Sequence, residues 1–193
     1  GVAGTTVLNP TPADLTVGSY SSGTNSAKVL QLGGTSTGNT VGGVISNGTA
    51  GTVAVTKTDS STWTLAGTNT YTGDTTVDAG VLAVSGGNAI PDTGNLVING
   101  GKVAPSGTIE TVNFLYFGAT QQAAGTWGAT GSGATHIDDA HFTGTGVVSV
   151  TNGTGGGYAD WALTNAPGQT ANQDFDLDGV SNGVEFVLGG SAT

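Results

Sequence analysis

Residues 63–82 read WTLAGTNTYTGDTTVDAGVL, and this stretch decides the fold. Short apolar runs alternate with Thr and are separated by Gly, Asn and Asp, which are turn-forming residues. Alternation with a period of two is typical of strands that have one face against a core. Similar segments recur up to about residue 150, among them residues 53–55, 96–98, 113–117 and 147–150. The sequence therefore predicts many short, similar β-strands.

Two all-β architectures are compatible with such strands. A β-sandwich usually has longer strands, hairpin turns and more aromatic core residues, whereas Phe, Tyr and Trp make up only 6% of this chain. A solenoid of stacked parallel strands needs short, similar strands and weakly charged turns. We therefore predict an all-β fold, a right-handed parallel β-helix (solenoid) over residues 1–150, with about 6 or 7 coils of roughly 20 residues each.

Two segments also resemble a known repeat. Residues 44–58 and 63–82 resemble the autotransporter-associated β-strand repeat, and the pattern W-T-L-x-G-x-N-T-Y-T-G-x-T-T-V-x-A-G-x-L is matched at nearly every position. Residues 114–150, which include GTWG at 125–128 and FTGTGV at 142–147, resemble the segment that closes such repeats in surface proteins of Planctomycetes and Verrucomicrobia type. The resemblance implies a β-helical passenger on the surface of a Gram-negative-type bacterium, and it names no activity.

The composition restricts the classes of partner. The chain has 193 residues, 36 Gly, no Cys and no Met, and a net charge of −10 from 13 acidic and 3 basic residues. This charge would repel nucleic acid and anionic membranes. Without Cys, stability has to come from repetitive hydrogen bonding and stacking. No run of 18 apolar residues is present, so we expect no membrane insertion. The resemblance implies an extracellular or cell-surface location.

The sequence changes character after Val150. Residues 151–157 read TNGTGGG, which predicts a flexible linker. Residues 158–163 predict a short amphipathic helix, and Pro167 ends it. We therefore predict a small EF-hand-like calcium-binding module with short helices over residues 158–193.

Residues 174–185, DFDLDGVSNGVE, have the ligand spacing of an EF-hand calcium loop. Side-chain oxygens stand at loop positions 1, 3, 5, 9 and 12, and Gly179 at position 6 allows the sharp turn. The predicted calcium ligands are Asp174, Asp176, Asp178, the backbone carbonyl of Val180, Asn182 and Glu185. The loop also resembles those of dockerins and thrombospondin type 3 repeats. The alternative interpretation is a solvated acidic turn.

Other candidate sites are weaker. His136 and His141 flank Asp138 and Asp139, but their spacing matches no zinc motif and favours a polar surface turn. Aromatic residues that could stack on sugars are assigned instead to the solenoid core; they are Trp63, Tyr71 and Trp127. Acids before residue 150 are mostly isolated and Arg is absent, so we expect no catalytic site.

The sequence leads to three hypotheses of function. The first is a non-enzymatic structural protein of the cell surface or extracellular matrix that self-associates end to end into fibres. The uncharged segment of residues 1–8 lacks any cap and is expected to lie in the subunit contact, in a head-to-tail arrangement. The alternative is an adhesin or carbohydrate-binding passenger that contacts polysaccharide or a cell surface. A weaker alternative is a β-helical polysaccharide-degrading enzyme.

Overall fold

The computed structural model describes residues 3–23, 25–49 and 51–154, and the single residues 170, 173 and 181. The chain divides into two units, Gly1–Asn152 and Gly153–Thr193. Every strand lies in the first unit, and the described residues contain no helix. The predicted linker beyond residue 154 and the short helices of the predicted module lie outside the described residues. Among the described residues, no helix is long and apolar enough to cross a membrane.

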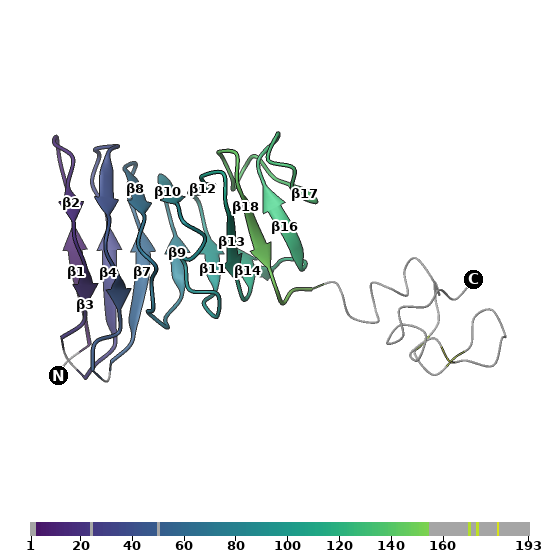
Figure 1. The fold of residues 1–193 in the computed structure, drawn as a ribbon, viewed down its shortest axis with the longest axis horizontal. Coiled ribbons are helices and arrows are strands. Elements are labelled where there is room, and N and C mark those ends of the chain that lie inside the picture. Colours follow the sequence, from purple (N-terminus) through teal and green to yellow (C-terminus); the bar gives the residue numbers. More distant parts are fainter. Residues whose placement is uncertain are drawn as a thin grey trace. The chain divides into compact units, whose positions relative to one another are not determined.

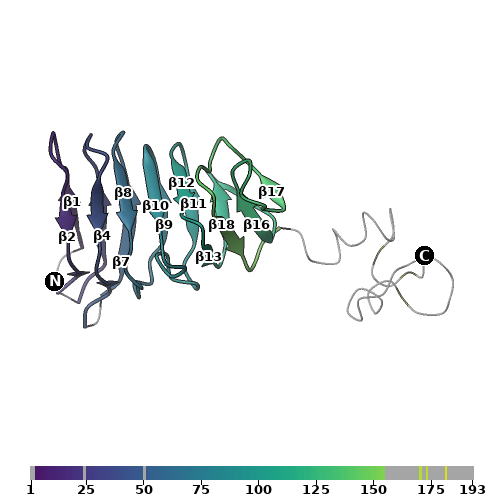
Figure 2. The ribbon, with the colours of Figure 1, turned by 45° about the horizontal axis from the view of Figure 1, so that its top comes forward.

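The largest sheet has seven strands, and Figures 1 and 2 show its early strands side by side along the stack. Their order in the sheet follows their order in the sequence, because each coil adds one strand beside the strand of the preceding coil. The strands are β1 (Gly4–Leu8), β4 (Lys28–Leu32), β7 (Val53–Lys57), β9 (Thr75–Val77), β11 (Leu96–Ile98), β14 (Leu115–Phe117) and β15 (Thr120–Gln121). All neighbours pair in parallel except β15, which runs antiparallel to β14. The chain therefore passes through this side of the stack repeatedly in one direction.

The other sides of the stack carry smaller sheets. A five-stranded parallel sheet contains β2 (Thr16–Val17), β5 (Asn39–Val41), β8 (Thr62–Leu65), β10 (Val81–Val84) and β12 (Lys102–Pro105). A two-stranded parallel sheet contains β3 (Tyr20–Ser21) and β6 (Ile45–Ser46). A four-stranded mixed sheet has the order β13 (Ile109–Val112), β18 (Val147–Val150), β16 (Gly125–Gly128) and β17 (His136–Ile137). This pattern confirms an all-β, solenoid-like fold of mostly parallel strands.

Alternation within each strand builds the core. In β7 the residues Val53, Val55 and Lys57 are buried, and the two between them are half-buried. The same rows continue through the stack, because Leu30 pairs with Val55 and Val55 with Thr75. Each coil therefore adds a layer of inward side chains to one continuous core that includes Leu82, Ile98 and Val103. Contacts between successive coils join residues 24 or 25 apart in the early coils, 20 or 21 apart in the middle coils and 19 apart between β11 and β14.

The later end of the stack is covered by strands that reverse direction. β15 lies antiparallel on β14, and β16 lies antiparallel on β18. Val103 of β12 is bridged by Phe142. At the other end, β1 and β2 are the outermost strands of their sheets. Their inward residues Leu8 and Val17 are only half-buried, whereas the paired Leu32 and Val41 are at most 1% exposed.

Candidate functional site

Five of the eight acids in the described residues join successive coils. Each of the following accepts a hydrogen bond from a residue one coil away: Asp14 from the Gly38 amide (2.9 Å), Asp59 from the Gly34 amide (3.0 Å), Asp74 from Asn95 (3.0 Å), Asp78 from Asn99 (2.7 Å) and Glu110 from the Ile90 amide. The described residues bring no three His, Cys, Asp or Glu side chains together. In the described stack, these five carboxylates therefore hold coils together and form no acid/base constellation.

Glu110 is the acid with the most unusual surroundings. It is 1% exposed, and its Oε2 has no hydrogen-bond partner among the described residues. Burial raises the pKa of this carboxyl to about 7, and the charge of Asp92 acts in the same direction. In an earlier coil, buried Asn69 accepts from the Ile45 amide at 2.8 Å and donates to the Ala89 carbonyl at 2.6 Å. Glu110 accepts a hydrogen bond from the neighbouring coil as Asn69 does, but it donates none to a described residue.

Lys57 is a lysine in the core. Its side chain is fully buried, and its Nζ donates to the carbonyl oxygens of Thr58, Asp59 and Ala79, the last two at 2.9 and 3.1 Å. Asp59 itself has a left-handed backbone (φ 56°), which curls the turn around the ammonium group. Burial lowers the pKa of Lys57 to about 8, and the negative charge of Asp59 opposes this shift. The ammonium group thus fastens a turn to the next coil.

The two histidines stack on aromatic rings near the later end of the stack. His136 lies on Trp127 with ring centroids 4.4 Å apart, and His141 lies on Phe117 at 3.8 Å. Phe117 also contacts Trp127 edge-on at 5.3 Å. His141 Nδ1 is 2.8 Å from Asp138 Oδ2. The predicted turn is present at residues 139–141, and both rings also pack on aromatic side chains, in positions that suit a structural role.

The aromatic residues considered as sugar-stacking groups lie elsewhere. Trp63 is fully buried and donates from Nε1 to the Gly33 carbonyl at 2.8 Å. Tyr71 is 1% exposed, and its hydroxyl is 2.6 Å from Thr75 Oγ1. Trp127 is half-buried, packs against the core and carries His136 on its ring. The prediction that these rings serve the core is confirmed for Trp63 and Tyr71.

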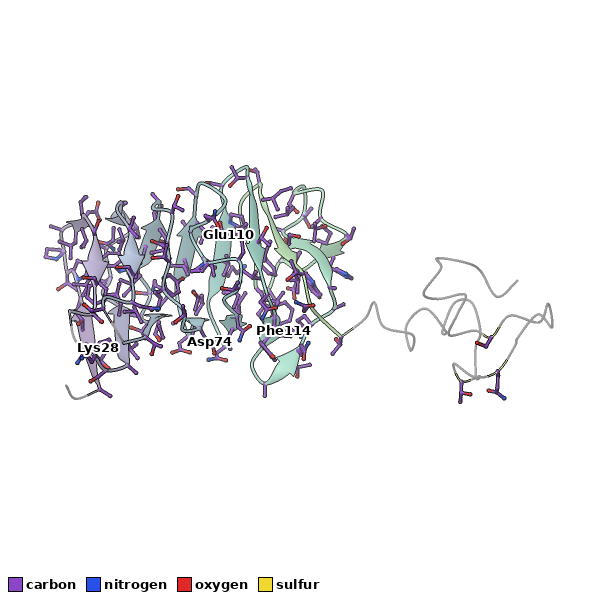
Figure 3. The ribbon with its side chains drawn as sticks, turned by 60° about the horizontal axis from the view of Figure 1, so that its bottom comes forward. Lys28, Asp74, Glu110 and Phe114 are labelled. Atoms are coloured by element: carbon purple, nitrogen blue, oxygen red, sulfur yellow. The ribbon has the colours of Figure 1, made fainter. Side chains whose placement is uncertain are left out.

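An outward-facing group of polar and aromatic residues lies on the seven-stranded sheet, between β9 and β14. Thr75, Leu96 and Leu115 pair across these strands and are buried. The residues beside them therefore face outward in two rows. The first row is Asp74, Asn95 and Phe114, and the second is Thr76, Val97 and Tyr116; we call these six residues the outer platform. In Figure 3 Asp74 and Phe114 lie along one side of the stack.

Hydrogen bonds join Asp74 and Asn95 of the outer platform to each other and to two asparagines beside the platform. Asn152 donates to Asn113 at 2.7 Å, Asn113 to Asn95 at 3.4 Å, and Asn95 to Asp74 at 3.0 Å. The rings of Phe114 and Tyr116 are 6.3 Å apart and inclined by 53°, so they do not cover each other's faces. Sequence reasoning missed this pair, although the alternation NFLYF at 113–117 places both rings opposite buried Leu115.

The expected calcium site cannot be placed, because its residues lie outside the described part of the chain: Asp174, Asp176, Asp178, Val180, Asn182 and Glu185. In this region only residues 170, 173 and 181 are described. The Thr170 amide donates to Gln173 Oε1 at 2.7 Å, and the Gln173 amide donates to the Thr170 carbonyl at 3.0 Å. Calcium binding therefore stays a prediction.

The stacked coils and the inter-coil bonds define a repeat solenoid. Residues 55–84 match the passenger-associated-transport-repeat family. A segment of 64 residues is 41% identical to the Adhesin BmaC autotransporter of Brucella suis biovar 1 (strain 1330), and it covers 33% of this chain and 2% of that protein. No solved structure matches the chain significantly. The resemblance to an autotransporter passenger repeat is thus confirmed for the central coils, and the chain spans only a small part of its relative.

Proposed function

We propose that the chain is a non-enzymatic structural segment of a bacterial surface passenger, exposed on a Gram-negative-type cell. The observation that carries this proposal is the passenger repeat at residues 55–84 within a continuous stack of parallel strands. The use of five acids as inter-coil links supports a structural over a catalytic role. Such a stack provides a stiff support with outward side chains free to vary.

Labelling of intact cells of the producing bacterium tests the location. Antibodies raised against residues 1–152 are expected to label intact cells, and brief external protease treatment should remove the signal. A periplasmic protein serves as the control for leakage. Labelling that requires lysis of the cells would refute the surface role.

Adhesion is a second candidate function. The relative with 41% identity is named an adhesin, and the outer platform offers two aromatic rings beside hydrogen-bonding groups. Purified chain coated on beads should then retain polysaccharide or cells, whereas a purely structural segment would retain neither. Equal retention by coated and uncoated beads would exclude adhesion by this segment.

For assembly, we propose end-to-end association through the β1 edge. Gly4 and Leu8 bond to the next coil through the Gly4 amide and the Leu8 carbonyl. Since alternate residues of a parallel strand bond to opposite sides, the backbone of Thr5 and Val7 faces away from β4. β1 contains no charge or Pro to discourage strand addition, and Val7 is 54% exposed. In a head-to-tail fibre, the β1 edge of one chain would contact the opposite end of the stack in the next chain. That end is covered by the antiparallel strands β15 and β16.

Electron microscopy of two matched variants tests this assembly. Val7→Lys puts a charge on the β1 edge, while Val44→Lys changes a residue with 40% exposure in the next coil. We expect Val7→Lys to abolish fibres and Val44→Lys to preserve them. Fibres of unchanged length in Val7→Lys would refute the placement of the contact at β1.

We also propose that calcium binds residues 174–185. A single loop of this type should bind with a Kd on the order of 0.1 to 1 mM, the range of extracellular modules. Isothermal titration should show loss of binding in Asp174→Ala and in Glu185→Ala. A chelator should leave the hydrogen-exchange protection of residues 3–150 intact. Unchanged titration in both variants would contradict the assignment.

A further inference from the structure

We propose that the outer platform binds a neutral polysaccharide, with Phe114 and Tyr116 as stacking surfaces and Asp74 and Asn95 as hydrogen-bonding groups. This inference rests on the adhesive form of the proposed function, for which it names the site and the class of ligand. None of these four residues was among the candidates from the sequence.

The two rings provide flat apolar surfaces of the kind that cover the C–H faces of sugar rings. Phe114 and Tyr116 are half-buried, so each ring keeps part of its surface accessible to solvent. Their centroids are 6.3 Å apart and the planes are inclined by 53°, which leaves the ring faces uncovered by each other. Neighbouring Phe117 instead packs with Trp127 and His141. Within the described residues the two rings are therefore separate from the aromatic cluster of the later end.

The polar groups lie on strands adjacent to the rings. By the register of β9, β11 and β14, Asp74, Asn95 and Phe114 occupy one outward row. The Leu96 amide donates to the Phe114 carbonyl at 2.9 Å, which fixes this register. A polysaccharide lying across the strands would thus meet a ring first and then an amide and a carboxylate. A few fixed polar groups beside apolar surface are typical of ligand sites.

Hydrogen bonds between side chains preorganise these groups. Asn95 donates one N–H to Asp74 and accepts from Asn113. An amide nitrogen has two N–H donors and a carboxylate two oxygens. One N–H of Asn95 and one oxygen of exposed Asp74 have no bond to a described residue. These groups can donate to and accept from sugar hydroxyls without disrupting the ladder.

Charge selects a neutral ligand over an anionic one. Asp74 is the charged group of the platform, and the chain carries a net charge of −10. Of the three lysines, Lys57 is buried, Lys102 belongs to the five-stranded sheet, and Lys28 is on β4, two strands from β9. Figure 3 shows Lys28 toward the early strands, away from Phe114. An acidic polysaccharide would therefore be repelled, whereas a neutral one loses nothing to electrostatics.

Affinity electrophoresis of the full chain tests the inference. Native gels containing hydroxyethyl cellulose, galactomannan or soluble starch serve as neutral probes, and polygalacturonate serves as the anionic probe. We expect at least one neutral polysaccharide to retard the chain and polygalacturonate to have no such effect. Phe114→Ala and Tyr116→Ala should each weaken the retardation about fivefold or more, since a stacked ring contributes on the order of 1 kcal/mol.

Three further variants separate binding from folding. Tyr116→Phe keeps the ring and should bind as the wild type does. Thr40→Ala changes an outward residue of the five-stranded sheet and should also have no effect. Thr76→Lys, in the platform but outside the core, should block binding while the circular dichroism spectrum stays unchanged.

Three results would overturn the inference, and the first two concern the neutral probes. One is no retardation by any of the three neutral polysaccharides, and the other is retardation that both alanine variants retain. Stronger retardation by polygalacturonate than by the neutral probes would also contradict it. Labelling of intact cells is independent of these gels. A chain that is labelled on intact cells but binds no polysaccharide would refute binding by the outer platform and would still support the surface location.

Discussion

Replacing Glu110 by Gln should remove much of the dependence of stability on pH between pH 5 and pH 8. The Glu110 carboxyl is 1% exposed and accepts from the Ile90 amide, and its Oε2 has no described partner. Burial raises its pKa from 4.5 to about 7. Gln keeps the acceptor for Ile90 and cannot ionise. The substitution therefore removes the charge and leaves the link between the coils.

The sign follows from where the proton is held. Between pH 4.5 and about 7 the unfolded chain has lost this proton while the folded chain retains it. The folded state then binds more protons, so the free energy of unfolding falls as the pH rises through this window. At 1.36 kcal/mol per pKa unit, the loss between pH 5 and pH 8 is about 2–3 kcal/mol. Above pH 8 this group should contribute no further change.

Urea denaturation at pH 5 and pH 8, followed by Trp fluorescence, measures the effect. The difference between the two pH values should be about 2–3 kcal/mol larger for the wild type than for Glu110→Gln. Any constant cost of the new amide group cancels in this comparison. Asp92→Asn, which removes a nearby exposed charge, should keep most of the wild-type dependence. Equal pH dependence in the wild type and Glu110→Gln would refute the reasoning.

Two further pairs of variants test the links between coils. Asn69→Ala leaves two buried backbone groups without partners and should cost about 2–4 kcal/mol in urea denaturation, whereas exposed Asn99→Ala should cost less than about 1 kcal/mol. A Cβ at Gly67 would lie 2.2 Å from the Gly43 carbonyl oxygen, so Gly67→Ala should cost about 2 kcal/mol or more. At Gly18 a Cβ meets nothing within 4 Å, and Gly18→Ala should change stability by less than about 0.5 kcal/mol. Equal effects within either pair would contradict the assigned contacts.

The strands were predicted well because inward and outward residues alternate within each strand, and this alternation can be read from a few consecutive residues. Residues 75–77, 96–98 and 147–150 were identified as strands from alternation, and each is a strand in the structure. Parallel stacking was also predictable, since short similar strands with weakly charged turns fit few other folds. The antiparallel strands β15 and β16 were not predicted. The pairing of β15 depends on a tight turn after Phe117, which pairs with Thr120. The pairing of β16 depends on distant residues, such as Trp127 with Val148, and no local period reveals it.

Lys57 shows where sequence reasoning on the core fails. It ends the pattern VAVTK, in which the first and third residues are inward. A charged side chain at the fifth position would ordinarily indicate solvent. Three carbonyl oxygens from two turns accept hydrogen bonds from the ammonium group. Two belong to the adjacent residues 58 and 59, and the third belongs to Ala79, which is 22 residues further along the chain. The partners of a buried charge are thus set by the coil length, which is visible only once the coils are stacked.

The same stacking explains where function can reside in this chain. Inward residues such as Val55 and Leu82 are constrained by the layers on both sides, and a turn residue such as Gly67 is constrained by the close approach of the neighbouring coil. Outward residues of the sheets meet solvent and neighbouring outward side chains. A row can therefore change its chemistry without cost to the core. Phe114 and Tyr116 are two half-buried aromatic residues in such rows and are not part of the buried core. The proposed polysaccharide site would give them a role that core packing does not.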